Sequence, residues 1–202
     1  MSSHMPSTYR DMFAVRAIAL LCLVSVSHSA PLACEDLLKP LDQLDPVNLE
    51  GRWAMVAESL KIIESEEPFA PSDSISIDFH NSTFIKVNRY NERCHYFSED
   101  ISLVGPHYYF QVGQMYNFSG TFFYTSCADC VVLSFKVEMP KEKTEELCLF
   151  SKRREVDEKE LREFIAQVEC LKMPEHIVMD PTKELCPAHP HHHHHHHHHR
   201  SD

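Results

Sequence analysis

Short runs of β-forming residues follow one another at intervals of about ten residues through the middle of this chain, and turn residues separate them. Eight strands spaced in this way predict an antiparallel all-β fold, either a sandwich or a barrel. The expected strands cover residues 49–59, 74–80, 84–90, 94–104, 107–114, 120–126, 130–138 and 145–152.

The periodicity changes after the last expected strand. Asp157 and Glu160, three residues apart, form a capping-box sequence that is typical of a helix start. Apolar residues then recur at helical spacing and form one stripe. Since this is a single helix after eight strands, we expect its stripe to pack on the outside of the sheet. The stripe consists of Leu161, Phe164, Ile165, Val168 and Leu171.

Both ends of the chain differ in composition from its middle. Arg16 precedes a short apolar run at residues 17–24, and small residues at 27–30 offer a signal-peptidase site. The run is too short to span a bilayer, so a retained membrane anchor is the less favoured interpretation. Nine histidines, His191 to His199, indicate a purification tag, the alternative being a native metal-binding tract. The expected organisation is a signal peptide with an N-terminal extension at 1–29, a folded domain at 30–190 and a His tag at 191–202.

The chain is acidic, with a formal net charge of −11. Such a surface repels nucleic acid and anionic membranes and favours cationic partners, although acidity also simply keeps a secreted protein soluble. The signal sequence predicts a secreted, extracellular protein in plasma or mucus, and the acidic charge predicts no nucleic-acid partner and no membrane insertion. We also expect a monomer. The histidines outside the tag are scattered, so neither a metal site nor a cofactor is expected.

Seven cysteines follow the expected signal peptide: Cys34, Cys94, Cys127, Cys130, Cys148, Cys170 and Cys186. In a secreted chain they indicate disulfides, and an odd count leaves one thiol over. Ala128 and Asp129 suit a two-residue turn, which would place Cys127 opposite Cys130. A local disulfide is the favoured interpretation of this pair, and a redox or zinc pair is the alternative.

That turn also predicts which side chains share a face of the sheet. The expected cross-strand pairs are Tyr124–Leu133, Phe122–Phe135, Leu133–Phe150 and Phe135–Cys148. In a sandwich the shared face would be core, whereas in an eight-stranded barrel it lines a cavity that holds one small ligand.

Gly51 and Trp53 on the first expected strand carry a family resemblance. Glycine lets the backbone enter the strand tightly, and the indole can close one end of a barrel. With eight strands and a C-terminal helix, Gly51-Arg52-Trp53 resembles the lipocalin family. Residues 164–174, Phe-Ile-Ala-Gln-Val-Glu-Cys-Leu-Lys-Met-Pro, and residues 31–34, Pro-Leu-Ala-Cys, resemble α1-acid glycoproteins at their two ends. The fish α1-acid-glycoprotein-like proteins that bind tributyltin and the pufferfish saxitoxin/tetrodotoxin-binding proteins look nearest.

The resemblance implies an eight-stranded antiparallel up-and-down barrel with one C-terminal helix outside. It also implies the disulfides Cys34–Cys170 and Cys94–Cys186, which leave Cys148 over. On strand 84–90 it turns Phe84, Lys86 and Asn88 inward, whereas hydrophobicity alone would turn Ile85 and Val87 inward. The expected ligand-binding residues are Met55, Phe84, Phe110, Phe122, Tyr124, Leu133, Phe135, Cys148 and Phe150.

The sequence departs from the lipocalin pattern at two places. Ala128-Asp129-Cys130 stands where the family usually has Thr-Asp-Tyr, and the cation expected over the tryptophan is either Lys152 or Arg153. Asn81 and Asn117 begin N-glycosylation sequons, which we expect to be used, because the family is heavily glycosylated.

The resemblance implies a carrier of a small ligand. An aromatic wall, an acidic chain and a soft thiol at Cys148 favour a small hydrophobic or cationic ligand, such as an organotin or a basic toxin, over a long-chain anionic lipid. Transport of a lipid or a hydrophobic hormone is the alternative, and Cys148 also has a plainer interpretation as a space-filling residue. A Cys148-dependent enzyme is disfavoured, because no His/Asp arrangement is evident to activate the thiol.

Overall fold

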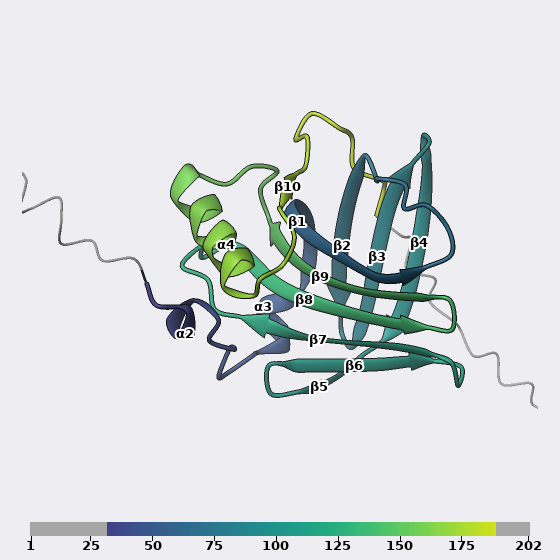
Figure 1. Cartoon of the computed structure of the whole chain (residues 1–202), viewed down its shortest axis with the longest axis horizontal. Coiled ribbons are helices and arrows are strands. Elements are labelled where there is room, and N and C mark those ends of the chain that lie inside the picture. Colours follow the sequence, from purple (N-terminus) through teal and green to yellow (C-terminus); the bar gives the residue numbers. More distant parts are fainter. Residues whose placement is uncertain (1–31, 189–202) are drawn as a thin grey trace, which may run out of the picture. The chain divides into compact units, whose positions relative to one another are not determined.

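A computed structural model describes residues 32–188 of the chain, so the expected signal peptide and tag lie outside the described residues. Nine antiparallel strands form one continuous sheet in the order β4-β3-β2-β1-β9-β8-β7-β6-β5, and β10 pairs with β1 (Figure 1). The strands are β1 (Gly51–Ser65), β2 (Ser74–His80), β3 (Thr83–Tyr90), β4 (Arg93–Asp100), β5 (Ser102–Val104), β6 (His107–Val112), β7 (Tyr116–Phe123), β8 (Cys130–Met139), β9 (Glu142–Ser151) and β10 (Ile177–Val178).

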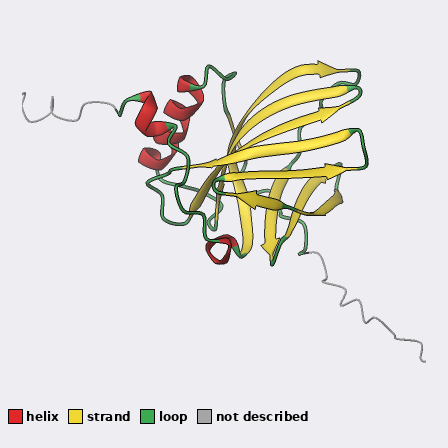
Figure 2. Cartoon of the chain, turned by 90° about the horizontal axis from the view of Figure 1, so that it is seen from below, coloured by secondary structure: helices red, strands yellow, loops and turns green. Residues whose placement is uncertain are grey.

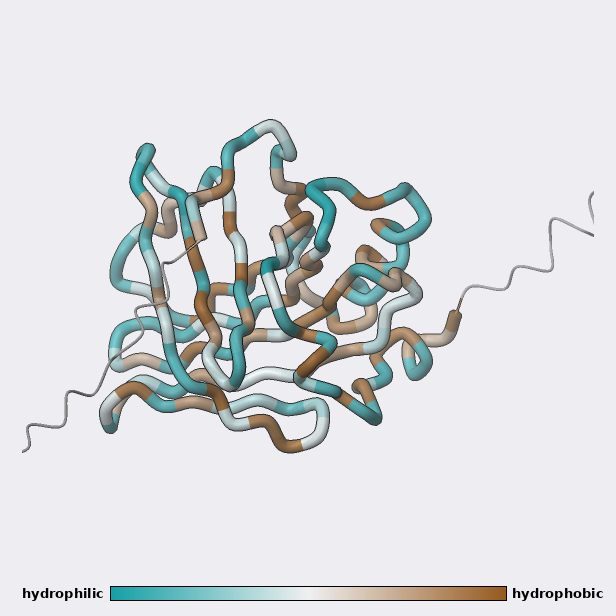
Figure 3. Tube along the Cα trace, turned by 180° about the vertical axis from the view of Figure 1, so that it is seen from behind, coloured by the Kyte–Doolittle hydropathy of each residue, from teal (hydrophilic) through white to brown (hydrophobic). Residues whose placement is uncertain are grey.

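The sheet curls around a shared interior, with the helices outside it (Figure 2). The strands mix hydrophobic and hydrophilic residues, as expected where only one face turns inward (Figure 3). The order of paired strands ends at β4 and at β5, and aromatic rings bridge the two sides. The ring of Phe97 on β4 lies 5.7 Å from Phe110 on β6 and 5.4 Å from Phe118 on β7. The predicted all-β fold is confirmed, except that the expected fourth strand is divided into β4 and β5.

The C-terminal helix, α4 (Glu158–Cys170), begins with the predicted capping box. The Asp157 side chain accepts a hydrogen bond from the backbone N–H of Glu160, whose side chain accepts one from the Asp157 backbone. Phe164 and Val168 are buried against the outer face of the sheet, with residues of β1, β8 and β9. Two short helices, α2 (Cys34–Leu37) and α3 (Pro46–Leu49), and β10 were not predicted.

Three disulfides tie the chain together. Cys34–Cys170 and Cys94–Cys186 are the two pairs that the family resemblance implied, and Cys127–Cys130 closes the turn before β8. The first two close loops of 136 and 92 residues, so the chain-entropy model gives each about 4–5 kcal/mol of stabilisation. Cys148 is a buried free thiol.

The start of β1 closes one end of the interior. Gly51 has a φ of +96°, which favours glycine, and Trp53 donates its indole N–H to the carbonyl of Leu49 at 2.9 Å. The ammonium of Lys152 lies 4.0 Å from the centre of the Trp53 ring and donates a hydrogen bond to the carbonyl of Glu50. Lys152, rather than Arg153, is therefore the cation over the tryptophan.

The predicted register of two hairpins is wrong by two residues. Phe122 lies opposite Leu133 rather than Phe135, and Leu133 lies opposite Cys148 rather than Phe150. The first connection is longer than expected, because β7 ends at Phe123 and the backbone N–H of Tyr124 then bonds to Lys39. The second is shorter than expected, because Met139 pairs directly with Glu142. A shift of two residues leaves every side chain on its expected face.

Candidate functional site

Aromatic side chains fill the closed half of the interior. The centroid of the Phe84 ring lies 5.4 Å from the centroid of the Phe79 ring and 6.0 Å from that of Phe135. The centroids of the Tyr108 and Phe122 rings are 5.8 Å apart. The space among these rings does not admit a water-sized sphere. This half is therefore a packed floor, and a ligand enters it only if rings move apart.

Eight of the nine expected ligand-binding residues belong to this one interior cluster: Met55, Phe84, Phe110, Phe122, Leu133, Phe135, Cys148 and Phe150. Tyr124 does not. It follows the end of β7, is 45% exposed, and its carbonyl accepts a hydrogen bond from the side chain of Gln167 on α4. The expectation that Tyr124 completes an interior aromatic wall is corrected accordingly.

The side chains of β3 have the orientation that the family resemblance implied, which is opposite to the orientation expected from hydrophobicity alone. Phe84 joins the interior cluster, and Lys86 reaches across the interior to Glu146 on β9. Ile85 and Val87 are buried instead on the outer face, where they pack with Cys186. The disulfide to Cys94 holds the C-terminal tail over that face, so apolar residues are needed on both sides of the strand.

Above the aromatic floor lies a group of ionisable side chains that we call the interior polar cluster: Glu58, Lys86, Glu146 and Cys148. The ammonium of Lys86 lies 3.8 Å from a carboxylate oxygen of Glu146, and the Cys148 thiol donates to the same oxygen at 3.7 Å. One carboxylate oxygen each of Glu58 and Glu146 lies within 4.8 Å of the other and of the Cys148 sulfur. Lys86 remains 23% exposed, so solvent reaches the cluster.

Burial and mutual charge set the protonation of this cluster. Burial, with the charge of Glu146, raises the pKa of Glu58 to about 7. Burial raises the pKa of Cys148 well above its usual value, so it remains a neutral thiol. Burial alone would lower the pKa of Lys86, but the nearby Glu146 and the other acidic groups raise it overall. The cluster thus holds a Lys86–Glu146 ion pair beside Glu58, a carboxyl group whose pKa is raised into the neutral range.

Sequence reasoning did not single out Glu58 and Glu146. The position of Glu146 could have been predicted, because it lies two residues before Cys148 and so shares its face of the strand. The position of Glu58 could not have been predicted from the sequence. A β-bulge between Met55 and Ala57 shifts the alternation along β1, so that Glu58 takes the inward position, and nothing in the local sequence marks this bulge.

A cavity of about 480 Å³ opens at the tips of the hairpins, within the size range of small-molecule sites. We call it the mouth cavity. Its lining comes from the end of β1 with Glu66 and Glu67, from Met115 and Tyr116, and from residues 139–142. Glu66 also pairs with Lys141 at 3.1 Å. Glu66 and Glu67 therefore place two carboxylates at this opening.

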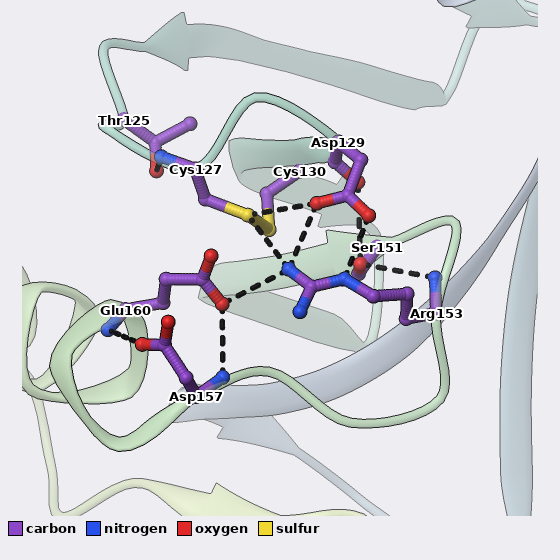
Figure 4. Close-up of polar contacts among 8 residues, drawn as sticks. All are labelled: Thr125, Cys127, Asp129, Cys130, Ser151, Arg153, Asp157 and Glu160. Carbon is purple, nitrogen blue, oxygen red and sulfur yellow. Dashed lines mark hydrogen bonds and ion pairs between the residues drawn. A yellow bond between two sulfur atoms is a disulfide. The ribbon is translucent and has the colours of Figure 1, made fainter.

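The departure from the family's Thr-Asp-Tyr sequence forms a structural clasp (Figure 4). Arg153 donates to both carboxylate oxygens of Asp129, at 2.6 and 2.8 Å, and to Glu160 on α4 at 2.9 Å. It also donates to the sulfur of Cys127 at 3.3 Å. These hydrogen bonds from Arg153 lower the pKa of Asp129. The clasp joins the turn before β8, the end of β9 and the start of α4.

No family model and no curated protein matches the sequence. Among solved structures, the solution structure of lipocalin 12 from rat epididymis is similar, with a TM-score of 0.61 over 74% of this chain and 93% of that chain. The chain has a lipocalin fold. The identity is 13%, so the likeness establishes the fold and leaves the ligand to be argued from the site. Lipocalin barrels characteristically hold one small ligand.

No helix within residues 32–188 is long and apolar enough to cross a membrane. The two sequons differ in setting. Asn81 is exposed in the turn between β2 and β3, whereas Asn117 lies on β7 and accepts a hydrogen bond from Tyr109 at 3.2 Å.

Proposed function

We propose that this protein is a secreted lipocalin-type carrier that holds a small ligand with an apolar body and a cationic group. The ligand lies in the open half of the barrel, between the mouth cavity and the interior polar cluster. The observation that carries this proposal is the pair of largely buried carboxylates, Glu58 and Glu146, in an otherwise apolar interior. Lys86 balances only one of them, and buried charge is costly without a partner.

The surroundings favour a soft or hydrophobic cation. Ring faces attract cations, and Lys86 already lies 5.3 Å from the centre of the Phe135 ring. The Cys148 sulfur is a polarisable contact at the same level of the barrel. An organotin of the tributyltin type or a basic toxin fits this chemistry. The disulfide framework suits an oxidising, extracellular setting, and we propose glycosylation at Asn81 and Asn117.

We also propose binding without turnover, and the state of the thiol supports this. A cysteine attacks as its thiolate, and burial together with the charges of Glu146 and Glu58 raises the pKa of Cys148, which disfavours that form. Transport of an anionic lipid is disfavoured because Lys86 is already paired with Glu146. A lipid carboxylate would have to displace that partner and would lie beside Glu58.

A displacement assay with two ligands of equal chain length tests the proposal. The neutral dye N-phenyl-1-naphthylamine reports occupancy, and decyltrimethylammonium competes against decanoate. We expect the cation to displace the dye at lower concentration, and Glu146→Gln to weaken the cation selectively. The matched control is Glu145→Gln, since Glu145 is the next residue and pairs outward with Lys61 and Lys136. Stronger displacement by decanoate contradicts the proposal.

A further inference from the structure

The flank of the barrel between β1 and β2 is open for much of its height. The ladder between these strands runs only from Gly51–Phe79 to Ala54–Ser76, although β1 continues to Ser65. Beyond Ala54, the free edge of β1 is taken by β10, which pairs at Ala57 and Glu58 (Figure 1). The loop between β1 and β2 and the C-terminal tail therefore meet beside the upper half of β1.

These segments enclose a second cavity of about 260 Å³, which we call the flank pocket. It is lined by Glu58 and Leu60 from β1, by residues 69–72 from the loop, and by Glu175 and Ile177 from the tail. It shares no lining residue with the mouth cavity. Phe69 and Ile177 are 45% and 51% exposed, so apolar surface is available at this site.

The carboxylates in the flank pocket lack partners. Within residues 32–188, the side chains of Glu58 and Glu175 make no hydrogen bond and no ion pair with the protein. Glu58 is nevertheless mostly buried, and the charges that act on it are those of Glu146 and Lys86. A desolvated carboxylate without a donor is costly, and a cation that supplies the missing charge removes that cost.

We propose that the flank pocket binds a small organic cation, a quaternary or protonated amine with an aromatic or branched alkyl body. The charged nitrogen lies against Glu58 and Glu175, and the apolar body lies against Phe69 and Ile177. This site shares Glu58 with the carrier site, but its other lining residues belong neither to the mouth cavity nor to the interior polar cluster. A ligand limited to about 260 Å³ is smaller than one that fills the mouth cavity.

Binding in the flank pocket competes with protons for Glu58. The groups that act on or lie beside Glu58 are Glu146, Lys86 and Cys148 from the barrel interior, and Glu175 from the tail lines the same pocket. Because the neutral carboxyl attracts a cation weakly, we expect the affinity to rise with pH through about 7, where Glu58 ionises.

The test compares two probes of the same shape, benzyltrimethylammonium and the neutral isostere 2,2-dimethylpropylbenzene, by amide NMR titration of the full chain. We expect only the cation to saturate at moderate concentration and to shift the amides of Phe69 and Ile177. Glu175→Gln should weaken the cation about threefold or more. Glu169→Gln, an exposed carboxylate on α4, is the matched control and should leave the affinity unchanged.

Equal binding of the two probes, or unchanged affinity in Glu175→Gln, overturns the flank site. The carrier proposal is judged separately, because Glu175 is outside the interior polar cluster. Displacement of the interior dye by decyltrimethylammonium should therefore persist in Glu175→Gln. Shifts confined to Met115 and Met139 would place the small cation in the mouth cavity and also overturn the flank site.

Discussion

Glu58 gives the protein a pH-dependent stability that a single substitution removes. Its pKa is raised from 4.5 to about 7 in the folded protein, and each pKa unit corresponds to about 1.4 kcal/mol. The shift therefore corresponds to a destabilisation of about 3 kcal/mol once the group is ionised. This destabilisation is an upper value, because solvent that reaches the cluster screens the charge of Glu58.

The direction in which stability changes with pH follows from proton binding. Between about pH 4.5 and 7 the folded protein retains the Glu58 proton while the unfolded chain has released it, so the folded state binds more protons. Stability attributable to Glu58 is therefore greatest at low pH and falls as pH rises through this window. Glu58→Gln has no proton to lose. Its stability relative to the parent should increase by up to about 3 kcal/mol from about pH 4 to about pH 8.

The assay is urea unfolding with intact disulfides, performed on the parent and on Glu58→Gln across this pH range. The difference between the two free energies of unfolding isolates the titration of Glu58. Glu64→Gln, on the exposed end of the same strand, is the control and should change stability by less than about 1 kcal/mol. A difference between parent and Glu58→Gln that is independent of pH, or that falls with rising pH, would refute the reasoning.

Three further predictions concern the scaffold. Gly120→Ala should cost about 3 kcal/mol or more by urea unfolding, because a Cβ there would lie 1.8 Å from the Ser134 carbonyl oxygen and 2.4 Å from the Tyr108 ring; an unchanged midpoint contradicts this packing. Replacing the Cys94–Cys186 pair by serines should cost about 3–5 kcal/mol in the same assay and release the tail, seen as faster hydrogen exchange in β3. Gln167→Leu should cost about 1–3 kcal/mol, because two backbone carbonyls lose the donor they share, and equal thermal midpoints would refute this.

The features that the sequence predicted are those that depend on local pattern. The strand succession, the helix and its capping box follow from periodicity and from Asp157 and Glu160, and these were confirmed. The two long-range disulfides rested on the family resemblance, since spacing alone does not choose among pairings.

The features that were missed depend on distant parts of the chain. The predicted hairpin register was wrong because β7 ends where the backbone N–H of Tyr124 bonds to the carbonyl of Lys39. No local sequence pattern predicts this contact. Hydrophobicity alone misplaced Ile85 and Val87, because the tail that buries them lies about one hundred residues further along the chain. The inward position of Glu58 depends on a bulge, and the polar cluster therefore emerged only from the fold.

The central claim is that the barrel interior holds a small hydrophobic cation. Native mass spectrometry of protein purified from its natural source, with any bound ligand retained, tests it most directly. We predict one ligand per chain, identified on release as a small apolar molecule that carries a positive charge. Release of a fatty acid or another anionic lipid in equal stoichiometry would contradict the claim.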